Sequence, residues 1–145
     1  MLITEILARN ARMYGNETAL VERDPAKNRR KEITWQEFDD HANKVARALM
    51  ARGIKKGDRV VHLMTNCIDW LPIYFGILRT GALAVPLNFR FVGKTIKRCA
   101  EPAGAKAFIF GEEFIERINS IKEDLNKFVD IYIFAGPEKI RPDYT

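Results

Sequence analysis

The chain has 145 residues, of which 47% are hydrophobic and 30% are charged, and its formal net charge is +5. This composition is that of a folded globular protein and excludes a chain that is disordered throughout. The length fits one domain with a core of its own. No run approaches the ~20 apolar residues that cross a bilayer, and the first residues lack the pattern of a signal peptide. We therefore expect no membrane span and a cytoplasmic location.

The cysteines and the basic residues exclude further classes of protein. Cys67 and Cys99 lie in no CxxC motif and no Cys/His cluster, so we expect two small buried thiols and neither a disulfide nor a zinc site. The densest basic segment, 27–31, contains no interleaved aromatic residue. We interpret it as a solvated turn between strands and expect no nucleic-acid partner.

The first third of the chain predicts a helix, a hairpin and a second helix. Hydrophobic spacing indicates a helix over 4–14, and segments 18–22 and 31–34 are expected to pair as an antiparallel hairpin. Thr34 and Glu37 have the spacing of a capping box, which predicts a helix start. The apolar residues behind this box repeat at helical spacing: Phe38, Ala42, Val45, Ala46 and Leu49.

The remainder alternates between strand and helix patterns. We expect strands at 59–64, 82–85, 106–110 and 129–134, and helices at 66–80, 93–100 and 112–127. Asn66 is the expected cap of its helix, which either begins nearer Asp69 or bends at Pro72. The alternation predicts an α/β fold with three layers, in which a mainly parallel sheet is flanked by helices and the hairpin lies at the N-terminus.

The segment LRTGALAVPLN, residues 78–88, combines three structural signals. Gly81 follows a helix end, where a residue without a Cβ most easily adopts the left-handed conformation. Residues 82–85 form a short apolar strand, and Pro86 removes the backbone donor that would extend the ladder. None of these residues carries a group that does chemistry.

Candidate catalytic and metal-binding residues are scarce. His41 and His62 have no serine or cysteine nucleophile nearby in sequence and no third ligand at a motif spacing, so we predict no catalytic residue and no metal site. Gly53 and Gly57 precede a strand, whereas a phosphate-cradling loop follows one. They are predicted to be turn glycines, and the chain contains no nucleotide-binding loop.

Six segments together resemble one family. They are ETALV (17–21), ITWQEFD (33–39), GIKKGDRV (53–60), NCIDW (66–70), LRTGALAVPLN (78–88) and GAKAFIF (104–110). In order and spacing they are similar to the beginning of an AMP-forming acyl-CoA synthetase of the adenylate-forming ligase family. The chain departs from the family at Phe89, where a proline is usual, and at Lys94 and Thr95, where a glutamate usually opens the helix. This departure leaves the subfamily and the substrate open.

The resemblance implies a two-step reaction. A carboxylic acid, expected to be a fatty acid, reacts with ATP and Mg²⁺ to give an acyl-adenylate, and CoA then displaces AMP. The family's reactive segments follow the part that this chain resembles. Residues 1–135 would therefore be an N-terminal subdomain and 136–145 a linker or a truncated end. The rest of the ligase would be its partner, and this chain alone would bind no cofactor firmly and be inactive.

The resemblance also implies a candidate cofactor contact. In some members of the family the phosphorylated end of CoA lies against the N-terminal region, which makes Arg90, Lys94 and Arg98 candidate contacts to CoA phosphates.

Two other classes of function stay open. One is a freestanding flavodoxin-like or receiver-like binding or signalling module. A receiver would need acidic residues at the carboxyl end of a strand to hold magnesium, whereas Asp58 precedes its strand. A self-associating interaction domain would pair an uncovered edge or helix face with a second copy, which makes a homo-oligomer possible.

Overall fold

A computed structural model describes all 145 residues, and the chain forms two compact units. Unit one contains Met1–Ile54 and Asn66–Gly81, and unit two contains Lys55–Thr65 and Ala82–Thr145. Each unit has a cluster of buried hydrophobic side chains of its own.

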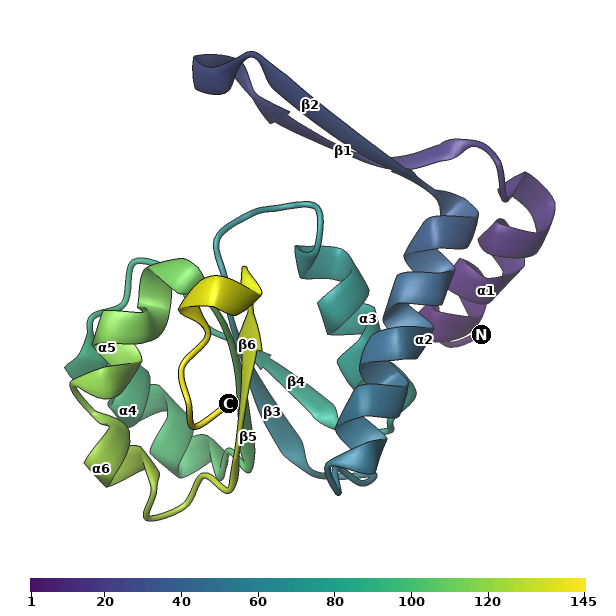
Figure 1. Cartoon of the computed structure of the whole chain (residues 1–145). Helices are drawn as coiled ribbons and strands as arrows, with labels where there is room; N and C mark the ends of the chain where they lie inside the picture. The colour runs from purple at the N-terminus through teal and green to yellow at the C-terminus, as the bar shows by residue number, and fades with distance from the viewer. The chain divides into compact units, whose positions relative to one another are not determined.

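Unit one consists of three helices and a hairpin. Its elements are α1 (Ile3–Tyr14), β1 (Thr18–Asp24), β2 (Arg29–Thr34), α2 (Trp35–Ala51) and α3 (Trp70–Arg79) (Figure 1). The helices meet in a small core of Leu7, Phe38, Ala42 and Phe75. The rings of Phe38 and Phe75 pack edge to face with their centroids 5.2 Å apart, a favoured geometry for an aromatic pair. Each of the three helices therefore contributes at least one buried side chain to the core of this unit.

The predicted antiparallel hairpin is confirmed and is longer than expected. Its strands reach Asp24 and Arg29, and a short 3₁₀ turn, Pro25–Lys27, joins them. The carboxylate of Asp24 accepts a hydrogen bond from the Lys27 N–H, and Asn28 adopts the left-handed conformation with φ 46°. Asparagine adopts that conformation more readily than most residues other than glycine, and the Asn28 N–H closes the turn by donating to the Pro25 carbonyl.

The capping box at the start of α2 is also confirmed. The Thr34 hydroxyl accepts a hydrogen bond from the Glu37 N–H at 3.2 Å, and the Glu37 carboxylate accepts one from the Thr34 N–H at 2.8 Å. Each side chain satisfies a donor that the helix itself leaves unpaired. These bonds to the carboxylate also lower the pKa of Glu37.

The third helix begins near Asp69, which confirms one of the two alternatives that the sequence left open. It begins at Trp70, and Pro72 therefore lies in the first turn, where the missing N–H interrupts no helical bond. The expected cap at Asn66 is wrong, because Asp69 precedes the first helical residue and Asn66 lies in the connecting segment. At the other end Gly81 has φ +80°, as the sequence predicted.

Unit two is built on a parallel sheet. Its strands are β3 (Arg59–Leu63), β4 (Leu83–Pro86), β5 (Ala107–Gly111) and β6 (Ile131–Ala135), in the order β4-β3-β5-β6. Its helices are α4 (Gly93–Ala103), α5 (Ile115–Asn119) and α6 (Lys122–Leu125), with short 3₁₀ turns at Glu112–Phe114 and Glu138–Ile140. All three strand pairs are parallel, so the predicted α/β fold, with a parallel sheet flanked by helices and an N-terminal hairpin, is confirmed.

The helices of unit two cover one face of this sheet (Figure 1). Side chains that alternate along the strands meet side chains from the helices in a core that includes Val61, Leu63, Phe108, Phe110, Ile96, Phe114, Ile118 and Leu125. Burial of such side chains is the main source of stability in a layer of this kind. Pro86 pairs with His62 at the edge of the sheet, where a missing donor is tolerated.

The predicted helix over 112–127 is broken into three pieces. A 3₁₀ turn leads into α5, and Ser120 and Ile121 separate α5 from α6. The Ser120 hydroxyl donates a hydrogen bond to the Arg117 carbonyl at 2.8 Å. Hydroxyl groups that bond to the backbone in this way compete with helix propagation, which explains the break.

Candidate functional site

The carboxyl ends of the strands in unit two lie where open α/β sheets bind ligands. Here Thr65 follows β3 and Glu113 follows β5, and the Thr65 hydroxyl donates to the Glu113 carboxylate at 2.5 Å. That carboxylate folds back over Gly111, since a Cβ on this glycine would lie 2.7 Å from Glu113 Oε2. The two strand ends are therefore joined by a polar contact, and the Glu113 carboxylate in it lies close above Gly111.

The loop that follows β4 is fixed from two sides. Asn88 accepts a hydrogen bond from the Arg90 N–H at 2.9 Å. Arg117 on α5 donates to the carbonyls of Phe89, at 2.6 Å, and Phe91, at 3.2 Å. Its guanidinium also lies over the ring of Phe114, 5.0 Å from the centroid. These contacts hold the backbone around Arg90 in one conformation, which no sequence motif indicated.

The three predicted CoA contacts all lie at the surface, on or just before α4. Lys94 and Arg98 are one turn apart on this helix, so they share a face, whereas Arg90 lies in the preceding loop with its guanidinium 5.5 Å from the Phe89 ring. Lys97 differs from them because it forms an ion pair with Asp124 at 2.9 Å. The structure thus brings two of the predicted residues together and leaves the third in a separate element.

The two histidines lie in different surroundings. His62 on β3 is fully buried, and burial lowers the pKa of its imidazole to about 4. His41 lies half-buried on α2. No three His, Cys, Asp or Glu side chains are grouped to hold a metal ion.

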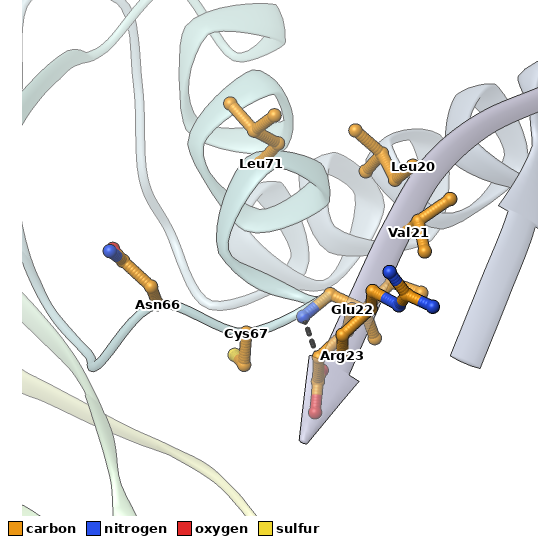
Figure 2. A pocket seen from close by; sticks show the side chains of 8 residues that line it. Leu20, Val21, Glu22, Arg23, Asn66, Cys67 and Leu71 are labelled. Atoms are coloured by element: carbon orange, nitrogen blue, oxygen red, sulfur yellow. Dashed lines mark hydrogen bonds between the residues drawn. The ribbon is translucent and has the colours of Figure 1, made fainter. Parts of the chain in front are cut away.

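A cleft in unit one is a feature that the sequence did not predict. It has a volume of about 330 Å³ and lies between β1 and the segment that leads into α3, as Figure 2 shows. Its lining consists of Leu20, Val21, Glu22, Arg23, Asn66, Cys67, Ile68 and Leu71. The Glu22 carboxylate accepts a hydrogen bond from the Ile68 N–H at 2.7 Å, which ties the strand to that segment. Five of these residues lie in the segments ETALV and NCIDW, whose patterns gave no indication that they line a common cleft.

The cleft offers contact surfaces, with no group activated for catalysis. Leu20 and Leu71 provide apolar surface, and Arg23 and Asn66 provide polar groups at the margin. Burial raises the pKa of the Cys67 thiol, so it stays protonated near neutral pH and is a weak nucleophile. The cleft is suited to holding a group and not to reacting with one.

The family match covers nearly the whole chain. Residues 7–141 match the family of AMP-binding enzymes. The chain therefore belongs to the AMP-binding enzyme family. It contains no helix that is both long and apolar enough to cross a membrane.

Curated relatives include several CoA ligases. The long-chain-fatty-acid–CoA ligase FadD13 of Mycobacterium tuberculosis is 33% identical over 90 residues, which are 62% of this chain and 18% of that protein. The 3-hydroxybenzoate–CoA/4-hydroxybenzoate–CoA ligase of Thauera aromatica is 33% identical over 95 residues, 66% of this chain and 18% of that protein. The chain thus spans about a fifth of the length of these relatives.

A solved structure of an N-terminal domain has the same fold. It is the inhibitor-bound N-terminal domain of FACL13 from Mycobacterium tuberculosis. The match covers 92% of this chain and 33% of that structure's chain, with a TM-score of 0.82 and 31% sequence identity. This chain is accordingly similar to the N-terminal portion of AMP-forming CoA ligases.

Proposed function

We propose that this chain is the N-terminal portion of a ligase that activates a carboxylic acid, expected to be a fatty acid, and transfers the acyl group to CoA. The observation that carries the proposal is the family match over residues 7–141, supported by a fold shared with the N-terminal domain of FACL13. In such a reaction a carboxylate oxygen attacks the α-phosphorus of ATP and pyrophosphate leaves. The CoA sulfur then attacks the acyl carbonyl, and AMP leaves.

Within that ligase the residues of this chain supply scaffold and contact surfaces. Gly53 and Gly57 have positive φ and precede β3 in the chain, whereas a phosphate-cradling loop follows a strand. We therefore assign no role in ATP binding to these two glycines. We propose that the 145-residue chain alone is inactive and binds neither ATP nor Mg²⁺ firmly.

Exchange of pyrophosphate into ATP tests this proposal. The purified 145-residue chain should show no carboxylate-dependent exchange. A longer protein, in which these 145 residues are followed by the rest of the ligase, should show carboxylate-dependent pyrophosphate exchange. It should also release AMP when CoA is added. Long-chain fatty acids, hydroxybenzoates and carnitine, the acids named for the relatives, form the substrate panel. Pyrophosphate exchange by the 145-residue chain alone would contradict the proposal. A complete ligase that is folded but inactive with every acid of the panel would contradict it as well.

We further propose that Arg90, Lys94 and Arg98 contact the phosphates of CoA. All three are exposed, and Lys94 and Arg98 share one face of α4. In the complete ligase, Arg90→Gln, Lys94→Gln and Arg98→Gln should each raise the KM for CoA and leave pyrophosphate exchange, which needs no CoA, unchanged. Arg47→Gln, at an exposed site on α2, is the control. An unchanged KM for CoA in all three variants would refute these contacts. Cytoplasmic location and formation of a homo-oligomer stay predictions.

A further inference from the structure

The tip of the β1–β2 hairpin carries a concave, positively charged surface that the proposed ligase reaction does not use. A cleft of about 380 Å³ lies there, and we refer to it as the tip cleft. It is lined by Arg23, Asp24, Pro25, Asn28, Arg29 and Arg30. Three guanidinium groups thus surround a hollow that contains a single carboxylate.

The strand register places two of these arginines directly opposite each other. Arg23 of β1 pairs with Arg30 of β2, and residues opposite each other in an antiparallel pair point to the same face. Like charges in such positions destabilise a hairpin. The next pair, Glu22 with Lys31, lies on the other face and has opposite charges. The Arg23–Arg30 pair is therefore unfavourable unless negative charge on the same face offsets it.

The surrounding carboxylates neutralise this pair only in part. Asp24 lies 3.7 Å from both Lys27 and Arg29, so it is engaged on the turn. Glu32 forms an ion pair with Arg30, and the hydrogen bond from Arg30 lowers the pKa of Glu32. Arg23 is exposed and forms no ion pair. The tip cleft is consequently lined by the guanidinium of Arg23, which has no acidic partner, and by that of Arg30, which is paired with Glu32.

We propose that the tip cleft binds a soluble phosphate-bearing anion between Arg23 and Arg30. A guanidinium presents its N–H groups in a planar fork that matches phosphate oxygens, and two arginines on one face of a hairpin can bind the same phosphate group. The occupant is soluble because the surface is concave and the turn offers only Pro25 and Ala26 as apolar groups, which is too little to enter a lipid layer. This site lies in unit one, whereas the proposed CoA contacts lie in unit two, so it is independent of the proposed function.

The test is a titration of the whole chain with inorganic pyrophosphate, followed by NMR of the arginine side-chain N–H groups. The Arg23 and Arg30 signals should shift together and saturate with one dissociation constant. Arg23→Gln should weaken this binding by about tenfold, the effect of losing a charge-assisted hydrogen bond. Glu32→Gln should tighten binding by about threefold, because it releases Arg30 from its ion pair.

Lys31→Gln provides the matched control. It removes the same charge from the same hairpin but on the opposite face, so it should change the dissociation constant by no more than about twofold. Circular dichroism confirms that each variant is folded. Equal weakening by Arg23→Gln and Lys31→Gln would overturn the proposal, because it would indicate a diffuse charge effect. Absence of saturable shifts, or binding to phosphatidate vesicles in place of pyrophosphate, would overturn it as well.

Discussion

Arg79 on α3 is joined to Asp39 on α2 by a largely buried ion pair, in which the two side chains are 13% and 15% exposed. The Arg79 guanidinium also donates to the Asp39 carbonyl at 3.0 Å and to the Asn43 side chain at 2.8 Å. Asn43 in turn donates to the Asp39 carboxylate at 3.2 Å. Asp39 ends the segment ITWQEFD, and Arg79 lies in LRTGALAVPLN. Two segments that resemble the family are therefore in direct contact across two helices.

The Asp39–Arg79 pair predicts a large loss of stability when either partner is removed. Arg79→Leu leaves the Asp39 carboxylate without its main partner in a poorly hydrated position, which should lower the free energy of unfolding by about 3–5 kcal/mol. Urea denaturation monitored by circular dichroism measures this. Arg47→Leu on the exposed side of α2 should change stability by less than about 0.5 kcal/mol.

The double variant Asp39→Leu/Arg79→Leu separates the ion pair from packing. It should be less destabilised than the sum of the two single variants, since no unpaired charge remains. Additive losses would contradict a direct coupling between the two side chains.

Gly76 on α3 predicts an unusual response to alanine. In an exposed helix interior, glycine to alanine stabilises by about 1 kcal/mol. At Gly76 an added Cβ would lie 2.5 Å from Val45 Cγ1 and 2.6 Å from Val45 Cβ on α2. Gly76→Ala should therefore destabilise by about 1–3 kcal/mol, as overpacking does, in a urea denaturation series.

The partner substitution tests that explanation for Gly76. Val45→Gly removes the two nearest atoms that the new Cβ would meet and leaves only the Ala42 carbonyl oxygen, at 3.0 Å, so Gly76→Ala should cost less in that background than in the wild-type chain. The same cost in both backgrounds would show that the close approach of α2 and α3 is not the cause.

Local sequence signals predicted the element types well because each signal acts within a few residues. The capping box at Thr34 and the left-handed Gly81 are examples, and both are present in the structure. Features that depend on distant residues were not predictable in this way. Nothing near Arg79 in sequence indicates that it bonds Asp39, and nothing near Asn66 indicates that β1 lies beside it in a cleft. The break at Ser120 was missed because hydrophobic spacing continues through it.

Protonation of His62 predicts a loss of stability at mildly acidic pH. Its pKa is lowered to about 4 in the folded chain, compared with about 6.5 for an unperturbed histidine. Between these values the unfolded chain binds a proton that the folded chain does not, so stability falls as the pH decreases from about 6.5 to about 4. At pH 5 the loss relative to neutral pH should be about 2 kcal/mol.

Two measurements check the assignment to His62. Urea denaturation at pH 7 and pH 5 gives the loss of stability, and His62→Gln should make that loss smaller. NMR titration of the imidazole should show that His62 stays neutral through pH 5. A His62 signal that titrates near pH 6.5 in the folded chain would contradict the prediction.

The last residues of the chain pack against the core of unit two. The ring of Tyr144 lies 5.4 Å from Tyr132 and 6.4 Å from Phe110, measured between centroids, and its hydroxyl donates to Asn119 at 2.7 Å. The Lys122 ammonium lies 4.6 Å from the Tyr144 ring centroid, within the range of a cation–π interaction. These contacts come from β5, β6, α5 and α6, so the segment is held by several elements.

Tyr144→Ala tests whether residues 136–145 act as a linker, as the sequence predicted. Loss of a half-buried aromatic ring and its hydrogen bond should lower the free energy of unfolding by about 2 kcal/mol. Tyr14→Ala, which removes an exposed ring from α1, should have a much smaller effect in the same urea series. Hydrogen exchange should also become faster in β6, because Tyr132 loses its edge-to-face neighbour. Wild-type stability and exchange in Tyr144→Ala would instead support a free linker.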